Sequence, residues 1–162
     1  IVMCSLISLN FNSSIFCCNS STLFLIRDND ECATISYEIN DVLGICKDAK
    51  EIISDSCEFY GSSYSARLSF SKNNSKTKSK YPILIEESKR IIFFPTWSLN
   101  NKKCMWLSYN NIKKVLKKGT GTRIIFSNNG FVDVDTSVKI FDRQLLICAD
   151  LEQLLISRQK ML

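Results

Sequence analysis

Short apolar runs separated by polar turns fill the second half of the chain. Runs of three or four apolar residues bounded by turn residues predict β-strands. The predicted strands cover residues 83–85, 91–94, 105–108, 123–126 and 131–134. Residues 86–89, 117–121 and 128–130 predict the turns between them, and Asn128-Asn129-Gly130 tolerates the positive φ of a hairpin turn.

The first half of the chain gives a weaker pattern. Residues 22–27 predict a buried strand, 28–30 a turn and 32–37 a second strand. Periodicity leaves 47–54 open between a short helix and an irregular strand. Gly61-Ser62-Ser63 predicts a capped helix that continues to Lys72. Residues 73–80 have no apolar side chain, which predicts an exposed, mobile loop.

Helical spacing begins at about Val138 and continues almost to the end of the sequence. Its apolar stripe consists of Val138, Phe141, Leu145, Cys148, Leu151 and Leu155. We expect this stripe to serve the core rather than a subunit interface. Together the patterns predict an α+β fold: a β-rich single domain with short strands and hairpins, a short central helix and a C-terminal amphipathic helix.

Composition narrows the possible chemistry. A chain of 162 residues with 45% hydrophobic residues is long enough for one cored domain. It has no histidine, which removes the Ser-His-Asp triad and the Cys/His zinc finger. Its eight cysteines include no Cys-x-x-Cys pair, so we expect reduced thiols in a cytoplasmic protein. We therefore predict no catalytic residue, no metal, no cofactor and no enzymatic activity.

The first twenty residues differ from the rest. They carry no charged side chain, and polar residues interrupt any run long enough to span a bilayer. We interpret 1–20 as an atypical extension or a mis-set start, and 21–162 as the functional domain, with no membrane partner.

Charge is concentrated in the middle of the chain. Residues 66–123 hold fourteen Lys and Arg but two acids, a net charge of +12, whereas the remainder carries −7. Such a segment attracts polyanions such as nucleic acid. The candidate DNA-binding residues are Arg67, Lys72, Lys76, Lys78, Lys80, Lys102, Lys103, Lys113, Lys114, Lys117, Lys118 and Arg123.

Ser62 and Ser63 form a further candidate, because a helix N-terminus at this point can face a phosphate. The simpler interpretation is that they only cap the helix. Any single surface lysine is likewise most often just solvated.

Five segments carry a family resemblance. Residues 56–67, 82–83, 92–96, 104–108 and 126–128 resemble the competence transcription factor family (ComK-type) of Gram-positive bacteria. The resemblance covers about residues 21–155. It implies a transcriptional activator of DNA-uptake genes that binds AT-rich double-stranded DNA, chiefly through the minor groove. It also implies a homo-oligomer, dimer or tetramer on DNA, and contact with the transcription machinery.

Three interpretations stay open. The chain is either such an activator or a degenerate ComK-like regulatory protein that no longer binds DNA; a single-strand binder is a third reading. Within the activator reading, the first choice for DNA contact is Lys76, Lys78 and Lys80, followed by the lysines at 113–118.

Overall fold

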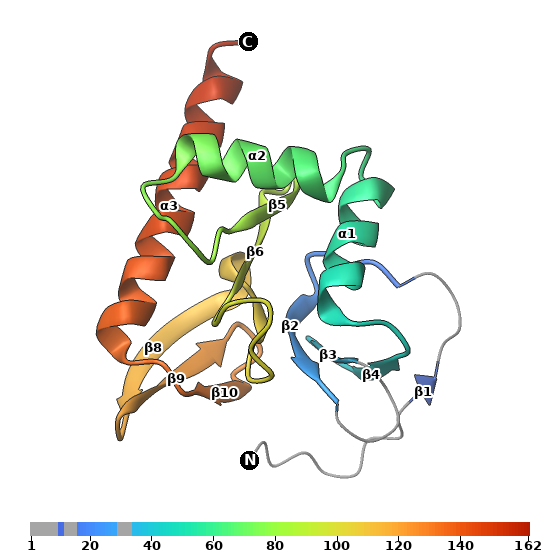
Figure 1. Ribbon diagram of the computed structural model, residues 1–162, viewed down its shortest axis with the longest axis vertical. Helices are drawn as coiled ribbons and strands as arrows, with labels where there is room; N and C mark the ends of the chain where they lie inside the picture. Colours follow the sequence, from blue (N-terminus) through green and yellow to red (C-terminus); the bar gives the residue numbers. More distant parts are fainter. Residues whose placement is uncertain (1–9, 12–15, 29–33) are drawn as a thin grey trace.

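A seven-stranded sheet forms the centre of the molecule (Figure 1). The computed structural model describes residues 10–11, 16–28 and 34–162. In spatial order the strands are β1 (Asn10–Phe11), β4 (Val42–Ile45), β3 (Thr34–Glu38), β2 (Thr22–Arg27), β7 (Trp106–Ser108), β6 (Ile91–Pro95) and β5 (Ile83–Glu86). The β1–β4 pair is parallel and the other neighbours are antiparallel.

A second sheet of three antiparallel strands follows along the chain. Its order is β10 (Phe131–Val134), β9 (Gly121–Phe126) and β8 (Ile112–Lys118). A 3₁₀ turn, η1 (Tyr109–Asn111), leads from β7 into β8. The helices are α1 (Ala49–Phe59), α2 (Tyr64–Asn74) and α3 (Val138–Lys160).

The large sheet is buried on both faces. Ile83 and Ile85 of β5 belong to the core that also contains α1 residues, whereas Leu84 belongs to the core shared with the small sheet and α3. A strand covered on both faces needs apolar side chains at every position. This explains why the sequence of β5 and β6 has continuous apolar runs rather than alternation.

Aromatic stacking holds the small sheet against the large one. The ring of Phe24 on β2 lies between Tyr37 at 4.4 Å and Phe126 on β9 at 5.1 Å, measured between centroids. Nearby, the Asn111 side-chain amide donates to the carbonyls of Ser20 and Thr22. Because β9 is fixed from its inner face, the opposite face of the small sheet is directed outward.

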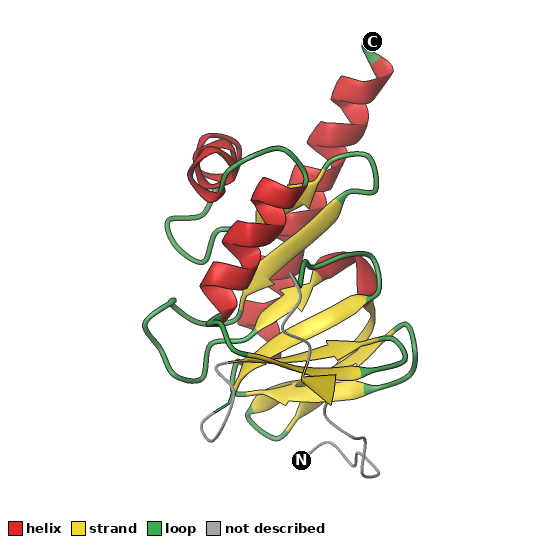
Figure 2. Cartoon of the chain, turned by 90° about the vertical axis from the view of Figure 1, so that its right-hand side faces the viewer, coloured by secondary structure: helices red, strands yellow, loops and turns green. Residues whose placement is uncertain are grey.

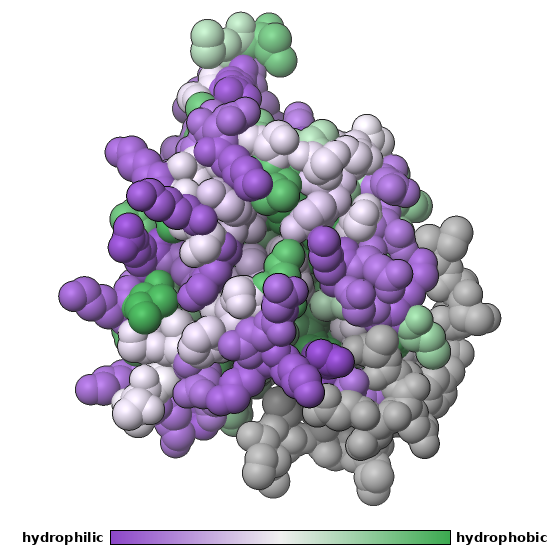
Figure 3. All heavy atoms as spheres, viewed as in Figure 1, coloured by the Kyte–Doolittle hydropathy of each residue, from purple (hydrophilic) through white to green (hydrophobic). Residues whose placement is uncertain are grey.

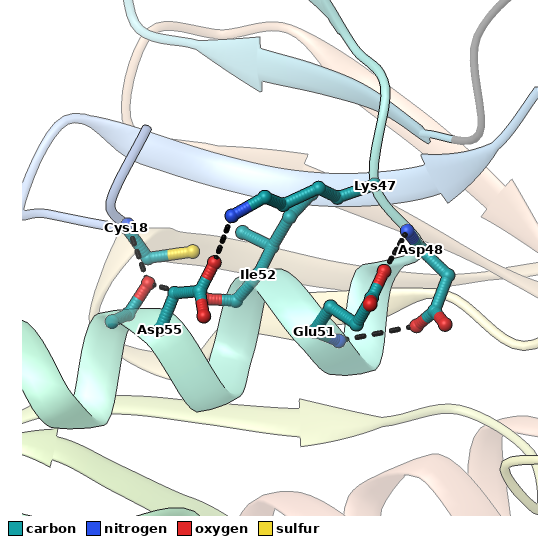
Figure 4. Close-up of polar contacts among 7 residues, drawn as sticks. Cys18, Lys47, Asp48, Glu51, Ile52 and Asp55 are labelled. Atoms are coloured by element: carbon teal, nitrogen blue, oxygen red, sulfur yellow. Dashed lines mark hydrogen bonds and ion pairs between the residues drawn. The ribbon is translucent and has the colours of Figure 1, made fainter. Parts of the chain in front are cut away.

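Two sets of hydrogen bonds fix helix α1: a capping box at its start and a contact with the N-terminal segment further along (Figure 4). Asp48 and Glu51 form a capping box, in which each side chain accepts from the other residue's backbone N–H. Ser56 of α1 then accepts the buried N–H of Cys18 at 2.9 Å and donates to the Ile52 carbonyl at 2.6 Å. Cys18 lies in the core, although it belongs to the segment expected to be an extension.

Most predicted elements are confirmed. The fold is β-rich α+β, and the ambiguous 47–54 segment belongs to helix α1. Ser63 is the N-cap of α2, as predicted, and accepts from the Ala66 N–H at 3.1 Å. Asn129 has φ 65°, as the predicted hairpin turn requires. Parts of the turn at 28–30 and of the strand at 32–37 lie outside the described residues.

Three strands were not predicted: the two-residue β1, β4 and β8. β4 is short, and its Gly44 weakens any strand signal. β8 carries four lysines in seven residues, a composition that is depleted in strands. Pairing with β9 over six registered residue pairs overrides that preference.

We predict that Ser56→Ala destabilises the protein by about 1–3 kcal/mol, because the buried N–H of Cys18 loses its acceptor. The free energy of unfolding in urea measures this. Ser69→Ala, at an exposed position of α2, is the control and should change stability by less than about 0.5 kcal/mol. Equal stability of both variants would show that Ser56 does not anchor the N-terminal segment.

Candidate nucleic-acid interface

The β8–β9 hairpin presents the densest group of unpaired cations. Lys113, Lys114, Lys117 and Lys118 are all exposed, and the described residues provide no carboxylate within ion-pair distance of any of them. Lys113 donates to the Asn129 side chain at 2.8 Å. Lysines on an edge strand also prevent unwanted strand pairing, which is the simplest interpretation of this pattern.

Register divides these lysines between two faces. Lys114, Leu116 and Lys118 stand opposite Ile125, Arg123 and Gly121 on the outward face. Lys117 stands opposite the buried Thr122, on the side that faces α3. The cationic groups therefore surround the hairpin rather than lining one flat surface, and Figure 3 shows hydrophilic side chains projecting from this side of the molecule.

The tip of the hairpin is narrow. Because Lys118 pairs with Gly121, the loop contains two residues, Gly119 and Thr120. Gly119 has φ 58°, which favours glycine. At Gly121 a Cβ atom would come within 2.5 Å of the Val134 carbonyl oxygen, so glycine is needed for close packing.

A hollow of about 690 Å³ lies between this tip and the first turn of α3. Its lining includes Lys117 and Lys139. Lys139 was not among the predicted site residues, because it lies beyond the basic middle of the sequence. Asp142 lines the same hollow and reduces its positive potential.

The last turn of α2 and the loop between α2 and β5 hold the second group of predicted residues. Lys76 and Lys78 are exposed and unpaired among the described residues, whereas Lys80 lies over the Trp97 ring at 5.4 Å and has φ 53°. Lys72 lies over the Tyr81 ring at 5.6 Å. These rings hold two of the four lysines in place without neutralising them. The predicted mobility of this loop remains a prediction.

Three predicted cations already have carboxylate partners. The Arg67 side chain is 13% exposed and bonds Glu87 at 2.8 Å, and Lys103 bonds Asp135 at 2.7 Å. Arg123 donates two hydrogen bonds to Asp133, at 2.8 and 2.9 Å, and lies over the Phe131 ring. These hydrogen bonds from Arg123 hold the pKa of Asp133 below its ordinary value of 3.8.

The remaining predicted site residues are one exposed lysine and two serines at the start of α2. Lys102 is exposed in the loop between β6 and β7. Ser62 donates its N–H to the Cys57 carbonyl, and the Ser63 hydroxyl already accepts from Ala66. The structure thus accounts for both serines as parts of the turn that begins α2, and a phosphate there stays a prediction.

Comparison with known proteins identifies the family. The family model described as "ComK protein" matches residues 13–160. The chain belongs to the ComK family. The "Competence transcription factor" of Bacillus subtilis (strain 168) is 33% identical over 98 residues, which are 59% of this chain and 50% of that protein. The chain thus aligns with half the length of that relative, and no solved structure shows significant similarity.

The family membership confirms the resemblance seen in the sequence. Within the described ranges, no group of His, Cys, Asp or Glu is arranged to hold a metal ion. Burial raises the pKa of Cys57 to about 11 and also raises the pKa of Cys148, so these thiols stay protonated. No described helix is long and apolar enough to cross a membrane.

We predict that Asp133 titrates below pH 3.8 in the folded protein, because Arg123 stabilises its ionised form. The pair then contributes its stability above pH 3.8, and this contribution is lost as the pH falls through the lower folded pKa. Carboxyl ¹³C NMR titration measures the midpoint. In the Arg123→Ala variant the midpoint should return to the ordinary value; an unchanged midpoint would show that Arg123 is not its cause.

Proposed function

We propose that this ComK-family protein is a DNA-binding transcriptional activator of competence genes that binds AT-rich duplex DNA. One observation carries the proposal: eight of the predicted DNA-binding residues are exposed lysines without a carboxylate partner among the described residues. They are Lys72, Lys76, Lys78, Lys102, Lys113, Lys114, Lys117 and Lys118. Exposed, unpaired lysines can replace the counterions of the phosphate backbone. The name of the Bacillus subtilis relative supports a role in competence transcription.

We propose that the β8–β9 hairpin makes the principal contact. Four of the eight lysines stand on it, whereas the loop before β5 contributes two. A rigid strand also loses less conformational entropy on binding than a loop does. This choice reverses the priority that the sequence alone suggested.

The hairpin tip suits the minor groove of A·T-rich DNA. That groove is about 6 Å wide, too narrow for a helix, and its negative potential attracts inserted lysines. The tip consists of Gly119, which has no side chain, and Thr120, which has a small one, and Lys117 and Lys118 directly precede it in the chain. A narrow cationic hairpin can therefore select such sites by shape, without a recognition helix.

The proposed activity implies further partners. A cytoplasmic activator that reads paired boxes would act as a homo-oligomer and contact the transcription machinery. Linking two binding units raises affinity through effective concentration. No cofactor is proposed.

Fluorescence anisotropy with AT-rich and G·C-rich duplexes tests the proposal. We expect tighter binding to the AT-rich duplex and an affinity that falls steeply with salt. Equal binding to both duplexes would refute AT selection. A preference for single strands, or no binding at all, would favour the alternative functions.

We predict that replacing Lys113, Lys114, Lys117 and Lys118 together by Ala abolishes most of the affinity for DNA. The slope of log K against log salt should decrease in magnitude by about 3 to 4, because each lysine that contacts a phosphate contributes about 0.9. Circular dichroism should show an intact fold, since all four side chains are exposed.

A matched control replaces four exposed lysines elsewhere: Lys47, Lys50, Lys89 and Lys160. It has the same net charge and should keep nearly the wild-type slope. If both variants lose equal affinity, net charge rather than the hairpin explains binding. A larger loss from Lys76, Lys78 and Lys80 together would move the contact to the loop before β5.

We predict that Asp133→Asn strengthens DNA binding, because it releases Arg123 and removes an acid from the outward face of the small sheet. The salt slope should become steeper by about 1. Asp55→Asn on α1, which releases Lys47 instead, is the control. Weaker binding by Asp133→Asn would show that the pair is needed to hold the sheet.

A further inference from the structure

The outer side of α3 carries an apolar stripe that the core does not use. α3 buries Phe141, Gln144, Cys148, Leu151 and Leu155 against the sheets. On the adjoining side of the helix, Leu146 is 61% and Ile140 is 50% exposed. Ile147 and Leu154 lie on the same stripe and are partly exposed. Figure 1 shows α3 along one margin of the molecule, and hydrophobic residues are visible between hydrophilic ones there (Figure 3).

Two charged residues of this stripe have no ion-pair partner among the described residues. Arg143 and Asp150 flank the exposed pair Leu146 and Ile147 on either side. They are seven residues apart, about 10 Å along the helix axis, which is too far for them to pair within one chain. Around the apolar centre, Arg143 therefore stands on the N-terminal side and Asp150 on the C-terminal side.

This arrangement complements itself under a two-fold axis. When two such helices cross in antiparallel orientation between Leu146 and Ile147, Arg143 faces Asp150 of the partner subunit, and the reverse pair forms by symmetry. Leu146 then packs against Ile147 of the partner subunit. A parallel pair would instead place Arg143 against Arg143 and Asp150 against Asp150, so charge favours the antiparallel pair.

We propose that this outer face of α3 is a self-association surface, through which two copies of the chain pair by antiparallel helix packing. The surface is distinct from the β8–β9 hairpin. The exposure of Leu146 and Ile140 makes this surface accessible to a second copy, and Figure 2 shows that the C-terminal part of α3 extends beyond the rest of the molecule.

The expected affinity is modest. A single helix pair buries less than the roughly 1,600 Å² of a standard interface, so we expect a micromolar dissociation constant. DNA with two neighbouring boxes would then strengthen pairing through effective concentration. This last use depends on the proposed function, whereas dimer formation in the absence of DNA does not.

Sedimentation velocity without DNA tests the pairing. The wild-type chain should shift from monomer to dimer over the micromolar range. Leu146→Glu should weaken the dimer by about tenfold or more, because it introduces like charges at the centre of the interface. Phe59→Glu is the control: Phe59 is 65% exposed, but on α1, and this variant should dimerise like wild type.

A charge exchange distinguishes this interface from a general loss of solubility or fold. Arg143→Asp and Asp150→Arg should each weaken the dimer, because each places like charges in contact. The double variant should restore it. A wild-type chain that stays monomeric into the millimolar range, or a double variant as weak as the singles, would overturn the proposal.

DNA measurements separate this proposal from the proposed function. Leu146→Glu should bind a single-box duplex as wild type does, but lose about tenfold in affinity for a two-box duplex. Dimerisation without any DNA binding would refute the function and leave the interface standing. Normal two-box binding by Leu146→Glu would refute the use of this interface on DNA.

Discussion

The stacking of Phe24 between Tyr37 and Phe126 determines how this molecule presents its charges. It joins the two sheets through a shared core, to which α3 adds Phe141, Cys148 and Leu155. Stacked aromatic rings bury a large apolar area, and this burial stabilises the contact between the sheets. Once the inner face of β9 is buried, the lysines of β8 have no route into the core and must face solvent.

The same constraint explains why some cations have carboxylate partners and others do not. Arg67 and Arg123 lie at positions where a packed surface has placed a carboxylate beside them, and both are paired. The lysines of β8 lie on an edge strand, where the described residues offer no such partner. A net charge of +12 in the sequence is therefore not a uniform surface but a mixture of structural pairs and exposed, unpaired charges.

Local patterns predicted much of the fold and less of the site. β2, β10, the Asn129 turn, the Ser63 cap and the stripe of α3 all have signals within a few residues. β8 has none, since its four lysines oppose the strand that pairing with β9 imposes. Which cations are paired was equally hidden, because Arg67 and Glu87, or Lys103 and Asp135, are distant in sequence and meet only in the folded chain.

Hydroxyl-radical footprinting on a duplex with two AT-rich boxes tests the central claim most directly, because the radical attacks the sugars along the minor groove. The account predicts protection of both strands across the minor groove of each box. Protection should disappear when Lys113, Lys114, Lys117 and Lys118 are replaced by Ala. Absence of protection by the wild-type protein, or protection that persists in this variant, would contradict it.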